Sequence, residues 1–277
     1  MPSGLISSAR EPILHENEFE KIRRLAYKTC GLNLTPSKHR LVAARLGRML
    51  TDLRLPSYRA YYDFVSADKT GVALAAMIDA LTTNHTQFMR EPAHFEYLRN
   101  VLLPTLRRRP RIDIWSAPCA TGEEPYSIAM VLFAELGVPP APAFTIRSVD
   151  ISTKALDKAC AGVYQTHRLA GLSGAQILRF FRQTSVGHFT VSPVLRQAVE
   201  FERVNLVEPL SDSRLYPLVF CRNLLIYFDT PTQEKVVRQL ASRLEPGGHL
   251  FIGHSESLTA LNHPLEYVQP AIYRMPD

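Results

Sequence analysis

The sequence lacks the features that would assign it to several specialised classes of protein. It has only four cysteines in 277 residues, and no two of them form a CxxC pair, so we expect neither a metal site nor a disulfide framework. No apolar run approaches the length of a membrane span, and the first residues have no signal-peptide apolar core. We therefore expect a cytoplasmic protein without membrane insertion, with a loose tail over residues 1–15.

A GxGxxG motif is also missing. The turn after the predicted strand Arg111–Ser116 has one glycine, Gly122, and Glu123 and Glu124 follow it at the start of a predicted helix. Two carboxylates at a helix N-terminus suit the helix dipole but would repel a phosphate and attract a cation, so a dinucleotide is disfavoured. S-adenosylmethionine fits better, because it has no phosphate and carries an ammonium and a sulfonium group.

Acidic residues are almost absent from the segment Lys21–Ala60. This segment has ten basic residues and one acidic residue, a net charge of +9 against +6 for the whole chain, so the remaining residues sum to −3. A field of this kind attracts an acidic partner, although a basic run is more often a solvated helix face. We predict that four residues of this run bind the substrate: Lys38, Arg40, Arg45 and Arg48.

What is present is a helical first part followed by alternating strands and helices. Residues 16–81 have apolar residues at helical spacing and predict a small bundle. Residues 82–90 are predicted to be a linker that contributes to the cofactor site. Residues 91–277 predict a Rossmann-like, mostly parallel α/β sheet covered on both faces, with a helix over 92–109 and a small β subdomain at about 183–204. The predicted strands are 111–116, 144–149, 199–204, 216–221, 249–253 and 271–275.

Polar residues follow two of these strands where each strand ends. The apolar run Leu218–Cys221 stops at Arg222-Asn223, and Asp150 ends the strand 144–149. Ligands of parallel α/β sheets bind at the carboxyl ends of the strands, where an acidic residue accepts hydrogen bonds from ribose hydroxyls. Aspartate is also a good helix N-cap, so Asp150 alone is a weak signal. Beside the Gly122 turn it favours a cofactor that contains adenosine.

Five stretches resemble the chemotaxis receptor glutamate O-methyltransferases (CheR family), and they occur in order through nearly the whole chain. They are residues 82–91 (TTNHTQFMRE), 115–127 (WSAPCATGEEPYS), 204–206 (VNL), 221–228 (CRNLLIYF) and 253–257 (GHSES). The resemblance implies a class I S-adenosylmethionine methyltransferase with an N-terminal helical domain. It also implies transfer of the methyl group to glutamate carboxylates on the cytoplasmic helical bundle of a chemoreceptor, for receptor adaptation.

By motif position, the resemblance places nine residues around S-adenosylmethionine and its product S-adenosylhomocysteine: Asn84, Thr86, Arg90, Glu124, Asp150, Asn205, Leu206, Arg222 and Asn223. It places Arg90 and Tyr227 beside the transferred methyl group, in catalytic roles. Most relatives have a second aromatic residue where this chain has Met89. In some relatives a glycine-rich hairpin docks a peptide from the C-terminus of the receptor. The matching segment 183–189 is short and has one glycine, so we predict that this chain does not dock such a peptide.

Two other functions compete with this interpretation. A nucleic-acid methyltransferase would suit the isoelectric point of 9.2, but amino-methylating members usually have an Asn/Asp-Pro-Pro-Tyr motif after the fourth strand. Here Arg222-Asn223-Leu224-Leu225 occupies that position, so we expect no nucleic-acid partner. A non-catalytic module that senses the cofactor is disfavoured by the full set of cofactor-position residues.

Overall fold

The computed structural model describes residues 12–141, 143–211 and 213–277. The chain divides into two compact units between Thr82 and Thr83. Most of the predicted loose tail lies outside the described residues, and Leu14, at its end, is buried. Within the described ranges, no helix is long and apolar enough to cross a membrane.

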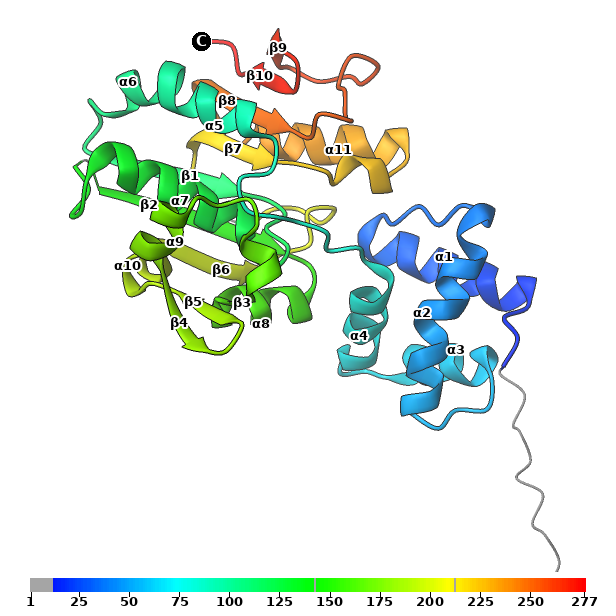
Figure 1. Cartoon of the computed structure of the whole chain (residues 1–277). Coiled ribbons are helices and arrows are strands. Elements are labelled where there is room, and N and C mark those ends of the chain that lie inside the picture. Colours follow the sequence, from blue (N-terminus) through cyan, green and yellow to red (C-terminus); the bar gives the residue numbers. More distant parts are fainter. Residues whose placement is uncertain (1–11, 142, 212) are drawn as a thin grey trace, which may run out of the picture. The chain divides into compact units, whose positions relative to one another are not determined.

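The first unit is a small bundle of helices (Figure 1). Its helices are α1 (Glu16–Cys30), the 3-10 turn η1 (Pro36–Lys38), α2 (His39–Asp52), α3 (Tyr58–Ala67) and α4 (Val72–Leu81). Each of the four α-helices places an apolar face in a shared core, represented by Phe19, Leu46, Tyr61 and Met77, all fully buried. The helical periodicity of the sequence therefore forms the interior of this unit.

The second unit is built on a seven-stranded sheet with the order β6-β2-β1-β7-β8-β10-β9. The strands are β1 (Arg111–Ser116), β2 (Ala143–Asp150), β6 (Val199–Arg203), β7 (Tyr216–Cys221), β8 (Leu244–Ile252), β9 (Glu266–Gln269) and β10 (Ile272–Arg274). The five neighbouring strands β6, β2, β1, β7 and β8 pair in parallel. β10 pairs antiparallel with both β8 and β9. The mostly parallel sheet is the one that the alternation of strands and helices predicts.

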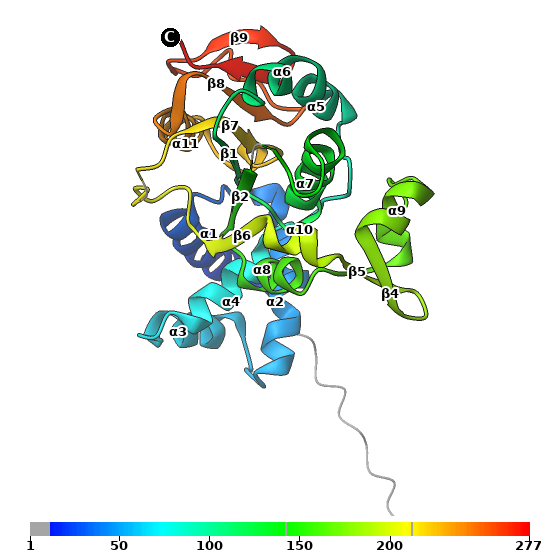
Figure 2. The same ribbon diagram turned by 90° about the vertical axis from the view of Figure 1, so that its left-hand side faces the viewer.

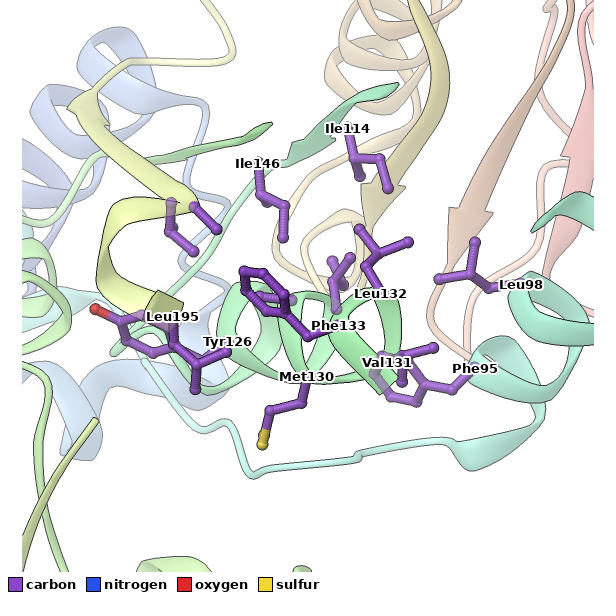
Figure 3. Close-up of a cluster of buried hydrophobic side chains, with 14 of the residues drawn as sticks. Phe95, Leu98, Ile114, Tyr126, Met130, Val131, Leu132, Phe133, Ile146 and Leu195 are labelled. Carbon is purple, nitrogen blue, oxygen red and sulfur yellow. The ribbon is translucent and has the colours of Figure 1, made fainter. Parts of the chain in front are cut away.

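Helices cover both faces of this sheet. One face packs under α5 (Pro92–Tyr97) and α7 (Glu123–Leu136), and the other under α11 (Thr230–Ala241). Figure 2 shows α11 on one side of the sheet and α5, α6 (Leu103–Leu106) and α7 on the other. Figure 3 shows side chains of α7, among them Leu132 and Phe133, beside Ile114 of β1 and Ile146 of β2. Apolar side chains therefore pack on both faces of the sheet, as expected for a mostly parallel sheet. Helix α8 (Thr153–Ala161) follows β2.

The predicted helix over 92–109 is not continuous. It consists of α5, a π-helical turn η2 (Leu98–Leu102) and α6 (Leu103–Leu106). Pro104 lies just after the π turn, and a proline inside a helix cannot donate a backbone hydrogen bond and crowds the carbonyl four residues earlier. The wider turn accommodates this crowding.

The small sheet differs from the predicted β segment at 183–204. It has the order β3-β5-β4, with β3 (Val163–Gln165), β4 (Phe181–Ser185) and β5 (His188–Val191). Its first strand comes earlier than predicted, and β6 belongs to the main sheet. Between β3 and β6 lie the 3-10 turn η3 (Thr166–Leu169), α9 (Gly174–Phe180) and α10 (Pro193–Gln197).

Candidate functional site

Three neighbouring parallel strands end at one edge of the main sheet and carry predicted site residues just beyond or at their ends. β1 lies between β2 and β7, with Ser116 in register with Ser148 on one side and Phe220 on the other. The strand order reverses at β1, because β2 and β6 lie on one side and β7 and β8 on the other. Ligands of open α/β sheets bind at such a reversal. We call the loops after β1, β2 and β7, together with the segment 83–91 that contacts them, the strand-end site.

The loop between β1 and α7, residues 117–122, which we call the β1 loop, turns at Gly122. This residue has φ of 93°, a left-handed conformation, and immediately precedes α7. A Cβ atom at Gly122 would lie 2.9 Å from both Ala159 Cβ and Tyr164 Oη. Only glycine fits here, because both the backbone conformation and the close neighbours exclude a side chain.

Asp150 ends β2 and is 4% exposed. Its carboxylate accepts hydrogen bonds from the backbone N–H of Ala120 in the β1 loop, at 2.9 Å, and of Ser152, at 2.8 Å. The Asn84 side chain donates to Ser152 Oγ at 3.2 Å. Asp150 therefore joins the loops after β1 and β2, and Asn84 brings segment 83–91 to the same place.

Arg222 follows β7, and only 2% of its side chain is exposed. Its Nη1 donates to Glu124 Oε2 at 3.2 Å, while its Nε and Nη2 donate to Glu91 Oε2 at 3.2 and 3.1 Å. Ser116 Oγ donates to the other oxygen of Glu124 at 2.7 Å. A buried guanidinium requires such pairing, and here it joins β7, α7 and segment 83–91. The sequence did not predict a role for Glu91.

The two carboxyl groups beside Arg222 differ in their pKa values. Burial raises the pKa of Glu124, and the Arg222 guanidinium offsets only part of this effect. Burial also acts to raise the pKa of Glu91, but Arg222 and the backbone N–H of His254 outweigh it and lower the pKa below its ordinary value. Glu124 is therefore the less compensated carboxylate, and a nearby cationic ligand would favour its charged form.

Arg90 and its neighbours lie in a strained part of segment 83–91. The Arg90 Nη1 donates to His85 O at 3.1 Å, and its Nε lies 4.0 Å from Glu91 Oε1. Met89 and Glu91 have φ values of 54° and 56°, which are uncommon for residues other than glycine and costly in energy. The backbone N–H of Met89 donates to Ser127 Oγ of α7 at 3.0 Å. These contacts hold the segment against the domain that carries the strand ends.

Glu256 joins the loops after β7 and β8. Its Oε2 accepts from the backbone N–H of Asn223 at 2.8 Å and of Gly253 at 2.6 Å. Burial raises the pKa of Glu256, and these backbone hydrogen bonds offset part of the effect. Asn223 has φ of 59°, and a Cβ atom at Gly253 would clash with the side-chain amide of Asn223. Sequence analysis did not predict a role for Glu256, which lies four residues after the end of β8.

The other predicted site residues are distributed around these loops. Asn205 and Leu206 follow β6, where the Asn205 side chain bonds to the next turn of the chain and Leu206 packs into the core beneath α11. Thr86 is buried in segment 83–91. Tyr227 lies in the 3-10 turn η4 (Leu225–Tyr227), with its Oη 3.5 Å from Thr83 O. Tyr227 therefore lies near the start of the segment that contains Arg90.

The four basic residues predicted to bind the substrate lie in the helical unit. Three of them are exposed: Lys38, Arg40 and Arg48. Arg45 is half-buried, and its Nη1 donates to Leu81 O at 2.6 Å and to Thr82 O at 3.0 Å. Basic side chains near a helix C-terminus satisfy its last carbonyl groups, so Arg45 stabilises the end of α4. The sequence did not predict this structural role.

A group of potential metal ligands lies beside Arg222. Ligand atoms of Glu91, His94 and His254 lie within 4.8 Å of one another. Glu91 already accepts two N–H groups of Arg222, and a guanidinium opposes a divalent cation at the same carboxylate. Burial, together with Arg222, lowers the pKa of His94 to about 3, so its ring is neutral at neutral pH. We interpret this group as the surroundings of the Glu91–Arg222 ion pair.

The chain matches two family descriptions that together span most of its length. Residues 84–273 match "CheR methyltransferase, SAM binding domain", and residues 17–82 match "CheR methyltransferase, all-alpha domain". A chemotaxis protein methyltransferase of Borreliella burgdorferi is 34% identical over 268 residues, 94% of each chain. Chemotaxis protein methyltransferase 2 of Pseudomonas aeruginosa is 38% identical over 260 residues, 92% of each chain. A chemotaxis protein methyltransferase of Salmonella typhimurium is 37% identical over 269 residues, 94% of this chain and 92% of the relative.

These matches agree with the geometry of the strand-end site. They confirm the predicted class I methyltransferase fold and its cofactor, S-adenosylmethionine. They also confirm the resemblance seen in the five sequence stretches, because the similarity extends through both units. The chain belongs to the CheR methyltransferase family.

Proposed function

We propose that the chain transfers a methyl group from S-adenosylmethionine to glutamate side chains on the cytoplasmic helical bundle of a chemoreceptor. The products are glutamate 5-O-methyl esters and S-adenosylhomocysteine. The relatives are chemotaxis protein methyltransferases and match 92% to 94% of this chain. The structural observation that carries the proposal is the charged cluster at the strand ends, in which Arg222 pairs with Glu91 and Glu124.

The chemical groups of the strand-end site fit the parts of S-adenosylmethionine. Its amino-acid end carries an ammonium and a carboxylate. The undercompensated Glu124 favours the ammonium, and the partly exposed Arg90 offers a guanidinium to the carboxylate. Asp150 would accept hydrogen bonds from the ribose. We propose that the remaining cofactor contacts come from Asn84, Thr86, Asn205, Leu206, Arg222 and Asn223. The bound cofactor supplies an electrophilic methyl group on a sulfonium.

The acceptor requires little acid–base chemistry. A glutamate carboxylate has an unperturbed pKa of about 4.3, so it is ionised at neutral pH and needs no general base. The protein must instead exclude water from the carboxylate and hold it about 3 Å from the methyl carbon. We propose that Arg90 and Tyr227 orient the incoming carboxylate. The Arg90 guanidinium lies 4.0 Å from Glu91, which moderates its pull on the acceptor and preserves the nucleophilicity of the carboxylate.

The modification removes one negative charge from a receptor helix. A charge change of this kind biases a helical bundle that has two arrangements of similar energy. Receptor adaptation is therefore the proposed outcome of the reaction.

A methyl-transfer assay tests this proposal. The protein is incubated with S-adenosylmethionine carrying a tritiated methyl group and with cytoplasmic fragments of candidate receptors. We expect label on the receptor fragment and its release as methanol in mild base, because carboxyl methyl esters are base-labile. Fragments with the target glutamates replaced by alanine serve as the control. Label that resists base, or label on added nucleic acid instead of receptor, would contradict the proposed reaction.

A further inference from the structure

We propose that Arg168 is a positioning residue that holds the β1 loop in the shape needed to bind the cofactor. This inference rests on the cofactor site proposed above. Arg168 belongs to η3, directly after β3 of the small sheet. None of the residues predicted for the cofactor site belongs to the small sheet or to η3. A role for this region in cofactor binding is therefore additional to the site proposed above.

Arg168 closes a ring of hydrogen bonds at the start of α7. Glu123, the first residue of α7, has a completely buried side chain. Its Oε1 accepts from Arg168 Nε at 3.0 Å and also from Arg168 Nη2, and its Oε2 accepts from Thr121 Oγ1 at 2.6 Å. Arg168 Nη2 in turn donates to Thr121 Oγ1 at 3.2 Å. The guanidinium therefore neutralises a buried carboxylate and fixes a side chain of the β1 loop.

Residues 163–169 comprise β3 and η3, and we call them the arm. A tyrosine of the arm makes a second contact with the β1 loop. Tyr164, in β3, donates from its Oη to Thr121 O at 2.7 Å. Burial raises the pKa of Tyr164 well above its ordinary value, so the hydroxyl keeps its proton and remains a donor. The Tyr164 ring also packs against Phe88 of segment 83–91, with the ring centroids 5.0 Å apart. The arm therefore contacts two parts of the strand-end site.

The position of Thr121 explains why these contacts affect the cofactor. The preceding residue, Ala120, has φ of 46°, and the following residue, Gly122, has φ of 93°. Ala120 also donates its N–H to the Asp150 carboxylate. Glycine adopts a positive φ readily, but alanine does not, and the strain at Ala120 persists only where the surroundings hold it. Without Arg168, the buried Glu123 carboxylate loses the cation that pairs with it, and the loop can relax away from Asp150.

Four variants, among them Arg168→Lys, separate a positioning role from a merely structural one. Arg168→Met removes the guanidinium and leaves Glu123 without a cation. The double variant Glu123→Gln/Arg168→Met also removes the buried charge, so it restores stability without restoring the ring. Arg196→Met is the matched control, because Arg196 bonds to Ala161 O and Thr190 Oγ1 beside the small sheet, away from the β1 loop. S-adenosylhomocysteine affinity is measured by calorimetry on the full chain, and the melting temperature is measured without ligand.

We expect Arg168→Met to bind S-adenosylhomocysteine about tenfold more weakly, within the usual range of coupling between neighbouring sites, and to melt at a lower temperature. The double variant should recover the melting temperature but not the affinity, whereas Arg196→Met should keep the affinity. Arg168→Lys should regain part of the affinity. Full recovery of affinity in the double variant, or unchanged affinity in Arg168→Met, would overturn the inference. An unmodified chain that fails to bind S-adenosylhomocysteine would instead overturn the proposed cofactor site, and the inference with it.

Discussion

Replacing Arg222 by methionine should destabilise the sheet unit strongly. The side chain of Arg222 is 2% exposed, and those of its partners Glu91 and Glu124 are 13% and 9% exposed. Methionine keeps much of the apolar stem but leaves two buried carboxylates without their cation. Breaking a buried ion pair in this way costs about 3–5 kcal/mol. For a domain of roughly 150–250 residues, each kcal/mol lowers the melting temperature by about 2–4 °C, so we expect a loss of about 6–20 °C.

This loss should depend on pH, with a sign that follows from the pKa shifts. In the unmodified chain Arg222 acts to lower the pKa values of both Glu91 and Glu124. Without Arg222 both values rise, and a carboxyl group with a raised pKa in the folded state loses stability as the pH rises through that pKa. The deficit of the variant should therefore be larger at about pH 8 than at about pH 5, where protonation neutralises part of the buried charge.

Denaturant unfolding at both pH values measures the deficit. Arg238→Met is the control, because Arg238 forms an exposed ion pair with Glu234 at 3.3 Å, and such pairs contribute about 0–1 kcal/mol. The double variant Glu124→Gln/Arg222→Met removes one of the uncompensated charges and should regain part of the stability. If Arg222→Met loses no more than Arg238→Met, or if its deficit stays constant with pH, the assignment of Arg222 as a buried charge partner is refuted.

Four further predictions concern the cofactor, the methyl transfer and the receptor. Asp150→Asn should weaken S-adenosylhomocysteine binding by about 1.5–3 kcal/mol in calorimetry, because it removes a charged hydrogen-bond acceptor; unchanged affinity would remove Asp150 from the site. Tyr227→Phe should lower kcat by up to about 100-fold through lost positioning and leave S-adenosylhomocysteine affinity nearly unchanged. Arg40→Gln/Arg48→Gln should raise KM for a receptor fragment and flatten its dependence on salt; Arg45 is left intact because it bonds to the end of α4. A receptor C-terminal pentapeptide should give little or no heat when titrated against the protein, since the hairpin at 184–191 is short; micromolar binding would contradict this.

The strands whose bounds were predicted correctly are those with mostly buried side chains. β1 and β7 have the bounds that the sequence predicts. β7 is buried at every position and appears as an apolar run, and β1 ends in three consecutive buried residues. The small sheet was placed wrongly because its strands carry no such pattern. In β4 only Phe181 is buried and the next four residues are exposed, and β3 has three residues. Strands this short and polar cannot be distinguished from loops by periodicity.

Sequence patterns singled out candidate site residues where the signal was local, and the cofactor-binding role of these residues stays a prediction. Asp150, Glu124 and Arg222 could be singled out because each lies at the end of a strand or the start of a helix within one short stretch of sequence. Their partners could not. Glu91 lies 131 positions before Arg222, and Glu256 lies 33 positions after Asn223. No periodicity or propensity connects residues so far apart, and only the folded chain shows which charges meet.

The carboxylates in and beside the strand-end site therefore divide into two groups by how their negative charge is stabilised. Glu91 and Glu256 serve other parts of the protein: Glu91 is held ionised by Arg222, and Glu256 accepts backbone N–H groups from two loops. Glu123 is likewise neutralised by Arg168. Burial raises the pKa of both Glu256 and Glu124, but of these two only Glu124 lies in the strand-end site, where Arg222 offsets part of the effect of burial. A buried carboxylate in this state is stabilised most by a ligand that brings its own positive charge, which explains physically why a site without a phosphate-binding turn suits a cationic methyl donor.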